Sequence, residues 1–252
     1  MRRVIGLAVL CTLFAPGLRA QRKFPPDSFT NLKVLPKKIG KQELIATMRG
    51  FALGLGVRCT YCHVGREGAP LDSVDFPKDD KRTKRAARVM IDMVNHINEE
   101  HLADVPDRPE PHVVVKCETC HRGVARPRLL GDEMALYLAD SGLASAARHY
   151  RDLRERYYGG EAYDFREFPL IDLARSEARA RRTENAMGLL QLSAEFFPNS
   201  GATPAASGDV YLDQGDTALA VASYREAVAK DSGLTWVRLR IQQLTGGTPK
   251  RP

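Results

Sequence analysis

The pentapeptide CTYCH at residues 59–63 ends an apolar, helix-like stretch that begins at Gln42, and its pattern returns as CETCH at residues 117–121. C-x-x-C-H is the sequence form of covalent haem attachment: two thiols add to the haem vinyl groups, and the adjacent histidine ligates the iron. We therefore expect two covalently bound c-type haems. The expected thioether anchors are Cys59, Cys62, Cys117 and Cys120, and the expected proximal ligands are His63 and His121.

Two other chemistries use paired cysteines, and both fit this pattern less well. A zinc ribbon has about 15–20 residues between its pairs, whereas residues 63–116, 54 in all, lie between the two pairs here. A thioredoxin-like redox pair needs no histidine and lies in a βαβ pattern, which this sequence lacks. The repeated histidine therefore favours haem.

The amino terminus has the features of a cleaved secretory signal. Two arginines precede an apolar run over residues 4–15, and a small-residue site follows at Ala20. The run is too short for a comfortable membrane span. Lipidation at Cys11 is an alternative, but Leu10 is bulky where such sites need a small residue, and an uncleaved anchor is a second alternative. We expect a signal peptide over residues 1–20 and a periplasmic or extracellular protein.

Removal of that segment changes both the cysteine count and the charge. Of the five cysteines, the four that remain all belong to the haem motifs, so we expect no disulfide even in an oxidising compartment. The net charge of +7 falls to +4, from 35 basic and 31 acidic residues, before haem propionates lower it further. This balance does not support nucleic-acid binding.

After a proline-containing lead-in over residues 21–40, a helix is predicted from Lys41. Its apolar residues recur with a 3.6-residue period, and Gly54 and Gly56 are expected to end it. The face consists of Leu44, Ile45, Met48, Phe51, Ala52 and Leu55.

Met48 lies near the middle of this face, 11 residues before Cys59. If the helix folds back over its own haem motif, the thioether can lie over the iron, opposite His63. The alternative is simple packing, because methionine fills irregular gaps in cores.

A second helix is predicted from Thr83 to Leu102, after a loop over residues 64–82. One face is apolar and contains Ala86, Met90, Met93, Val94 and Ile97. Met90, Met93 and His96 are all possible iron ligands, and each has a packing or surface role as the alternative. The β-prone run at residues 113–115 then leads into the second motif.

These features together resemble a known family, the cytochrome c subunit of photosynthetic reaction centres. The similarity is to its carboxy-terminal half and covers residues 31–126. It is carried by Leu35, Pro36, residues 43–48, residues 56–63 and residues 115–123. The resemblance implies a haem held by a helix followed by a C-x-x-C-H turn, twice. It also implies electron transfer toward a photo-oxidised pigment pair.

The resemblance further implies a distal ligand for the first haem. The family's helix methionine, 11 residues before the first cysteine, corresponds to Met48, and His/Met ligation would raise the reduction potential. The family's last haem takes a histidine from an amino-terminal half that these 252 residues do not contain. We expect a local replacement. The candidates, in order, are Met93, His96, Met90 and His112.

Residues 127–252 differ in character, being rich in alanine and leucine at helical spacing. Residues 184–198 resemble residues 216–231 at an offset of 32, close to the tetratricopeptide period of 34. We expect helical hairpins of tetratricopeptide type that dock a protein partner. The alternative is a hairpin bundle that only supports the haem domain.

The sequence thus predicts an all-α protein that carries single electrons and is not an enzyme. We expect a signal peptide at 1–20, an extended lead-in at 21–40, a dihaem domain at 41–126 and a helical-repeat domain at 127–252. The expected partners are a redox donor and acceptor, with a membrane reaction centre as one candidate. Two alternatives are a dihaem peroxidase with one open iron, for which no acid–base constellation is evident, and a haem-stapled scaffold.

Overall fold

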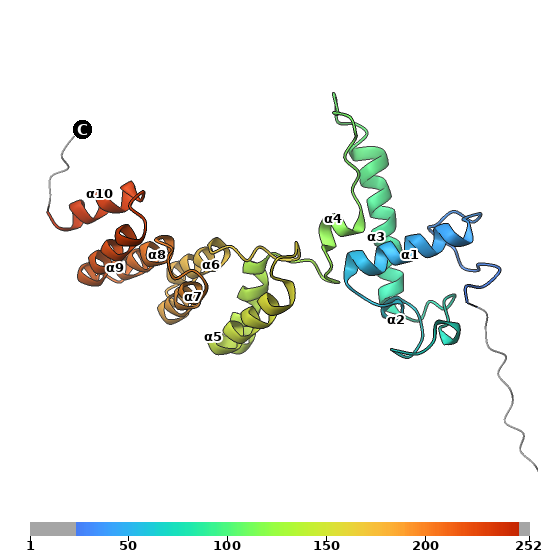
Figure 1. The fold of residues 1–252 in the computed structure, drawn as a ribbon, viewed down its shortest axis with the longest axis horizontal. Helices are drawn as coiled ribbons and strands as arrows, with labels where there is room; N and C mark the ends of the chain where they lie inside the picture. Colours follow the sequence, from blue (N-terminus) through green and yellow to red (C-terminus); the bar gives the residue numbers. More distant parts are fainter. Residues whose placement is uncertain (1–23, 247–252) are drawn as a thin grey trace, which may run out of the picture. The chain divides into compact units, whose positions relative to one another are not determined.

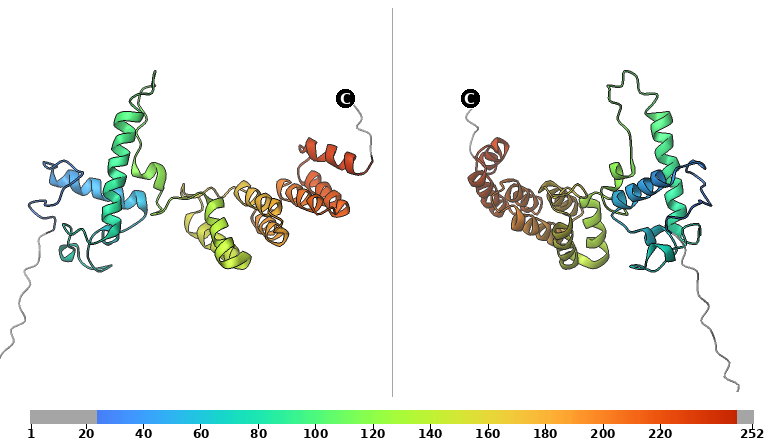
Figure 2. Two further views of the ribbon diagram at one scale, coloured as in Figure 1. Left: turned by 180° about the vertical axis from the view of Figure 1, so that it is seen from behind. Right: turned by 45° about the vertical axis from the view of Figure 1, so that its right-hand side comes forward.

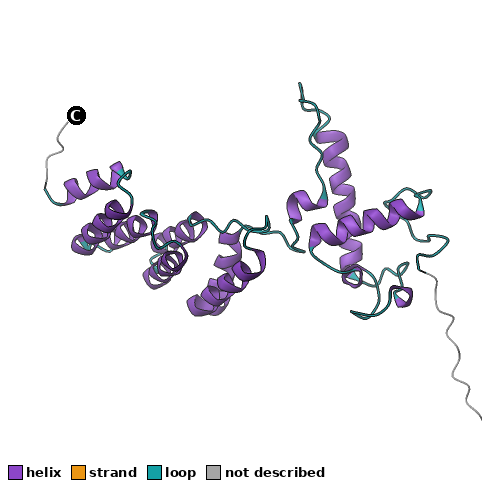
Figure 3. Ribbon diagram, viewed as in Figure 1, coloured by secondary structure: helices purple, strands orange, loops and turns teal. Residues whose placement is uncertain are grey.

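The computed structural model describes residues 24–246, and in this range helices are joined by loops without any strand (Figure 3). The expected all-α fold is therefore confirmed. The one isolated β-bridge in this range pairs Val64 with Asp75. None of the helices in residues 24–246 has both the length and the apolar character needed to cross a bilayer. The predicted signal peptide, including Cys11, lies outside the described residues.

The chain divides into two compact units. The amino-terminal unit runs to Cys117, except for residues 54–56, which group with the carboxy-terminal unit from Glu118 onward. Figure 1 labels their helices along the chain, and Figure 2 gives two further views.

Both long helices predicted for the amino-terminal unit are present. The first is α1 (Lys41–Leu55), and α2 (Cys59–Cys62) is the single turn of the first haem motif. The second long helix is α3 (Arg82–His96), which continues as one π-helical turn over Ile97–His101. A short 3₁₀ turn covers Leu71–Ser73. Gly56, at φ +64°, ends α1 as expected, and Val57 N donates to Ala52 O at 2.9 Å to close a Schellman turn.

The valine run at residues 113–115 forms no strand, and a side chain takes the place of a strand partner. Asn98 donates from Nδ2 to Val115 O at 2.8 Å and accepts from Val115 N at Oδ1 at 2.8 Å. These two hydrogen bonds satisfy both backbone polar groups of Val115, as a neighbouring strand would. The segment that leads into Cys117 is thereby tied to the π-helical turn after α3.

The carboxy-terminal unit is a series of packed helices that starts with a kinked one. α5 (Leu130–Tyr157) breaks at Gly142, which has φ +76° and ψ 174°. It follows α4 (Cys117–His121), the turn of the second haem motif. The later helices are α6 (Phe168–Arg179), α7 (Thr183–Phe196), α8 (Ala202–Asp213), α9 (Thr217–Lys230) and α10 (Thr235–Leu244). α6 packs against α7, and α8 against α9, as two hairpins (Figure 1).

The two hairpins repeat with a period of 34 residues. The first helix begins at 168 and then at 202, and the second at 183 and then at 217, so both starts are 34 apart. Buried positions repeat with them: Ala186 corresponds to Ala220, Leu190 to Tyr224 and Ser193 to Ala227. The sequence-derived offset of 32 was two residues short.

The error came from two acidic residues with different structural roles. At the predicted offset of 32, Glu184 corresponds to Asp216, but Glu184 lies inside the first turn of α7. Asp216 instead precedes α9 as its N-cap, and its carboxylate accepts from Leu219 N at 2.9 Å. Both positions favour an acid, for the helix dipole and for capping, so composition alone does not separate them.

Two apolar clusters hold this unit together. The larger joins α5, α6, α7 and part of α8, and its fully buried members include Tyr150, Leu170 and Leu189. The smaller joins α8, α9 and α10 around Tyr224 and Val237. Every buried residue of both clusters lies between residues 130 and 237. The carboxy-terminal unit thus has a core of its own.

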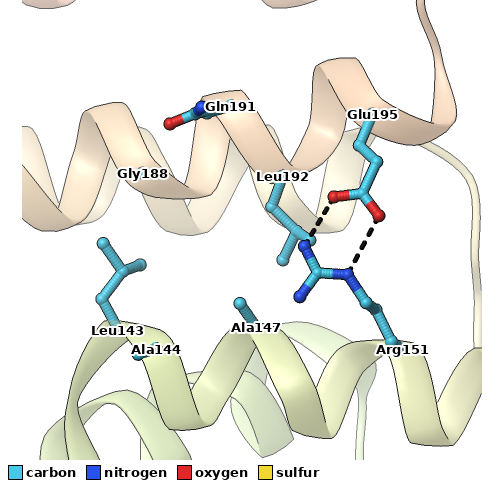
Figure 4. A pocket seen from close by; sticks show the side chains of 8 residues that line it. All are labelled: Leu143, Ala144, Ala147, Arg151, Gly188, Gln191, Leu192 and Glu195. Atoms are coloured by element: carbon cyan, nitrogen blue, oxygen red, sulfur yellow. Dashed lines mark hydrogen bonds and ion pairs between the residues drawn. The ribbon is translucent and has the colours of Figure 1, made fainter.

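A shallow pocket of about 300 Å³ lies between the second half of α5 and α7 (Figure 4). Arg151 closes one end with a two-pronged ion pair to Glu195, at 2.9 and 2.6 Å. At the other end Leu143 points toward Gly188, where a Cβ would lie 2.2 Å from a Leu143 methyl carbon. A glycine at this position therefore lets α5 and α7 approach closely.

Candidate haem sites

The first haem motif forms a single helical turn between two well-defined ends. Gly56 turns the chain out of α1, and His63 N donates to Cys59 O at 3.0 Å to close the turn. Cys59 is exposed and Cys62 is half-buried. Burial raises the pKa of the Cys62 thiol, while the nearby Lys81 ammonium and a hydrogen bond with Thr83 act in the opposite direction.

The loop after this motif returns to His63. Asp75 N donates to Val64 O at 2.7 Å, and this bridge closes the loop at its base. The residues just outside the bridge therefore meet: His63 Nδ1 lies 3.1 Å from Phe76 O, and the two rings lie 4.9 Å apart between centroids. A carbonyl oxygen can only accept, so the neutral imidazole carries its proton on Nδ1 and keeps the Nε2 lone pair for a metal.

The surroundings of His63 favour its neutral form. Burial lowers its pKa, and the positive charges of Lys84, Arg88 and Lys81 lower it further, against an opposing effect of the hydrogen bond to Phe76. A neutral imidazole is the form that binds iron, because the coordinating nitrogen must be unprotonated. The site is thus prepared for ligation near neutral pH.

The beginning of α3 holds the first motif and its loop through side-chain donors. The Lys81 ammonium donates to Thr60 O and the Thr83 hydroxyl to Tyr61 O. Lys84, one residue further, donates to three backbone carbonyls of the loop. These bonds satisfy polar groups that an irregular turn leaves without partners in its own backbone.

The second motif repeats the key feature with a tighter turn. His121 Nδ1 lies 2.9 Å from Val124 O, and Val124 N donates back to His121 O at 2.9 Å. Gly123, at φ +84°, makes this reversal possible. By the same reasoning as for His63, the Nε2 atom of His121 is the one left for iron.

The end of α1 contacts the turn that follows the second motif. Gly123 N donates to Gly54 O at 2.9 Å, and Gly54 is buried. Residues 54–56 and 123 belong to the same compact unit. The chain that leads into the first motif is thereby tied to the chain that leaves the second.

The predicted distal ligands lie on helices or in a loop. Met48 lies half-buried on α1, and Met93 and Met90 lie on α3 with 44% and 45% of their surface exposed. His96 pairs with Glu100 at 3.2 Å, and His112 pairs with Glu110 at 2.9 Å. The atom in contact with the carboxylate is Nε2 in both histidines. Ligation through that nitrogen would require the exposed glutamate partner to move.

The amino-terminal unit has almost no apolar core of its own. Among the described residues 24–117, Val74 is the one buried apolar side chain in the set of core residues. Large apolar side chains are instead exposed on α1, α3 and the segment before the second motif. They are Leu53, Val89, Met90, Met93, Val113 and Val114. A unit of this size needs a further source of stability, and a bound porphyrin would supply one by covering exposed apolar side chains of this kind.

Residues 26–135 match the model of the photosynthetic reaction centre cytochrome C subunit family. This part of the chain is similar to that cytochrome family. Its span includes both C-x-x-C-H motifs, α1 and α3, and it ends within the first turns of α5. The resemblance inferred from residues 31–126 is thus confirmed. No curated protein matches the chain.

The side chains that hold the two C-x-x-C-H turns and their loops could not be recognised in the sequence. Lys84, Asp79 and Asn98 bind backbone groups or one another around the two motifs. In the sequence, Lys84 and Asp79 belong to a charged run that looks like a solvated loop followed by a helix start. No spacing rule distinguishes a lysine that points into a ring of carbonyls from one that points to water.

Proposed function

We propose that this chain is an exported dihaem c-type cytochrome that relays single electrons between protein partners. One observation carries the proposal: both motif histidines direct Nδ1 to a backbone carbonyl, at 3.1 Å for His63 and 2.9 Å for His121. This arrangement fixes the tautomer that an iron ligand needs, and it occurs twice. The family of residues 26–135 is one of cytochrome electron carriers, which supports the same conclusion.

Each group of residues has a defined role in this proposal. Four cysteines anchor the porphyrins, His63 and His121 are proximal ligands, and Met48 and Met93 are distal ligands. The anchors are Cys59, Cys62, Cys117 and Cys120. Each haem, when bound, supplies a one-electron iron couple. If a histidine and a methionine both ligated each iron, no iron site would remain for a substrate, which would suit a carrier and not an enzyme.

The protein's own residues orient the ligands and cover the haems. The Phe76 and Val124 carbonyls hold the imidazole planes, and the first turn of α3 holds the loop that carries Phe76. The exposed apolar face of α3 would cover porphyrin and exclude water from its edge. A site with less water raises the reduction potential and limits the rearrangement that accompanies each electron.

We propose that the 34-residue hairpins form a tetratricopeptide-like module that docks a protein partner. Gly208 lies against the ring of Tyr224, where a Cβ would be 2.5 Å from a ring carbon, and Tyr211 follows three residues after Gly208. Ala220 precedes Tyr224 by four residues. This is the small-and-large packing pattern of that repeat. The expected partners are a redox donor and acceptor, with a membrane reaction centre as one candidate by family resemblance.

Haem counting and iron spin state test the proposal. We expect two haems per chain by the pyridine haemochrome assay, two low-spin signals in electron paramagnetic resonance, and a near-infrared methionine-to-iron band. The matched variants are Cys59→Ser with Cys62→Ser, and Cys117→Ser with Cys120→Ser, each of which should lose one haem. A single haem in the wild type would overturn the dihaem proposal. A high-spin iron in the wild type would favour the peroxidase alternative.

A further inference from the structure

We propose that Lys84 is a positioning residue for the first haem, acting through the carbonyl that holds His63. The inference rests on the proposed function, because it takes His63 as an iron ligand. It adds a residue on α3, 21 positions beyond the motif, to the groups that set the reduction potential of one haem and not the other.

The Lys84 ammonium lies in a ring of backbone carbonyls. Its Nζ atom donates to Phe76 O at 2.6 Å, Pro77 O at 2.9 Å and Lys78 O at 2.7 Å. The residue is only 9% exposed. A buried lysine needs compensating partners, and three carbonyls with one carboxylate provide them. This arrangement fixes the loop at the residue that His63 contacts.

One oxygen atom has two donors. Phe76 O accepts from His63 Nδ1 at 3.1 Å and from Lys84 Nζ at 2.6 Å, using its two lone pairs. A cation on this oxygen withdraws electron density, so the oxygen becomes a weaker acceptor for the imidazole proton. The imidazole then has less anionic character and donates less to iron. Weaker donation disfavours the ferric state and raises the reduction potential.

Asp79 keeps the ammonium in place and partly balances its charge. Asp79 Oδ1 lies 3.1 Å from Lys84 Nζ, while Oδ2 lies 2.8 Å from Arg88 and 2.9 Å from Lys33. Arg88 therefore shares the same carboxylate, and its recorded carbonyl partner is Asn31, not Phe76. Arg88 provides a control that changes the same local charge without losing the donor to Phe76.

The second motif provides the internal reference. His121 donates to Val124 O, a carbonyl outside the loop that Lys84 holds. Removing the Lys84 side chain should therefore change the hydrogen bond of one proximal histidine only. The two haems of one molecule would respond differently to one substitution.

The experiment is an optical redox titration of the full-length holoprotein in the wild type and in four variants. The Cys59→Ser, Cys62→Ser protein should retain only the second haem. Its single titration step therefore shows which of the two wild-type steps belongs to that haem. For Lys84→Met we expect the first haem's reduction equilibrium constant to fall about tenfold, which is about 59 mV for a one-electron couple. Arg88→Met should give about a threefold fall or less, because only the charge effect remains. The reduction potential of the second haem should shift by the same amount in Lys84→Met and in Arg88→Met.

Lys84→Arg separates the effect of hydrogen-bond geometry from the effect of positive charge. It also provides a test of the inference if Lys84→Met fails to retain haem. A planar guanidinium retains the charge but cannot direct its protons at three carbonyls as an ammonium does, so we expect a fall of about threefold in the first couple only. The inference would be overturned if the reduction potential of the first haem were unchanged in Lys84→Arg. It would also be overturned if that potential fell equally in Lys84→Met and Arg88→Met. A wild type with fewer than two haems would instead overturn the proposed function, so the two failures are distinct.

Discussion

The backbones of Gly56 and Gly123 are in direct contact: a Cβ placed on Gly56 would lie 1.9 Å from the carbonyl oxygen of Gly123. Gly56 also has φ +64°, in the region that side chains disfavour. The two glycines belong to different motifs in the sequence, one before CTYCH and one after CETCH. The turn that delivers the first motif and the turn that leaves the second therefore depend on each other.

Gly56→Ala should destabilise the protein by about 1–3 kcal/mol, because it adds both backbone strain and a collision with backbone atoms that cannot rotate away. The measurement is thermal unfolding followed by circular dichroism. Gly50→Ala is the control, since Gly50 lies in α1 with nothing within 4 Å of an added Cβ. Alanine there should be neutral or stabilising by about 0.5–1 kcal/mol. Equal melting temperatures for the two variants would contradict the expected contact.

His121→Ala should convert one of the two proposed haems from low spin to high spin and leave the other unchanged. The reason is that His121 is held by Val124 O in the orientation of a proximal ligand. Electron paramagnetic resonance of the oxidised protein measures the change. His101→Ala is the matched control, because His101 is an exposed histidine in the turn after α3. A low-spin pair in His121→Ala would exclude His121 as a ligand.

Acid should weaken the loop around Asp79. Hydrogen bonds from Arg88, Lys33, Asn31 and Lys84 hold the Asp79 pKa well below its usual range. The folded state therefore favours the carboxylate, so its stabilising effect is full above the ordinary aspartate pKa near 3.8 and is lost as the pH falls below that value. The melting temperature of the wild type should exceed that of Asp79→Asn at pH 7, and the difference should shrink toward pH 3.

Asp80→Asn removes the same charge one position along the chain and is the control for this series. Its effect should be smaller than that of Asp79→Asn at pH 7, because the four donors converge on Asp79. A difference between wild type and Asp79→Asn that stays constant from pH 7 to pH 3 would show that the carboxylate charge does not matter.

Gly208→Ala should loosen the second hairpin. Its Cβ would lie 2.5 Å from the Tyr224 ring, and that ring is fully buried with its hydroxyl donating to Asp209 at 2.8 Å. Overpacking of this kind costs about 1–3 kcal/mol. Urea unfolding followed by circular dichroism measures it. Gly131→Ala is the control, because its Cβ would make only an ordinary contact of 3.7 Å. Equal urea midpoints for Gly208→Ala and Gly131→Ala would mean that the Tyr224 ring moves aside without loss of stability.

The structural features that depend on short-range patterns could be predicted from the sequence. The helix from Lys41 and the helix after residue 82 follow from apolar periodicity, and both haem turns follow from a fixed spacing. The hydrogen bond of His63 to Phe76 does not, because it depends on a loop that closes over 13 residues. The carbonyl ring around Lys84 likewise depends on where a charged helix start meets that loop. Such contacts come from tertiary folding, which no local pattern encodes.

The distal ligands depend on the same kind of tertiary information. Met48 and Met93 are each marked by position on an apolar helical face, but several other side chains share those faces. Helix periodicity selects a face and not one residue on it. The proposed role of Met48 therefore rests on family resemblance, and that of Met93 on its place on the apolar face of α3.

The 34-residue spacing of the hairpins determines which changes of length this region can absorb. Duplication of residues 168–201 would add one hairpin whose buried positions again fall opposite their neighbours. An insertion of two residues within a helix would instead rotate everything after it by about 200°, at 3.6 residues per turn. Tyr224 would then face water. Over evolutionary time, this part of the chain is thus free to lengthen or shorten in whole hairpins, while shorter changes are confined to the turns between helices.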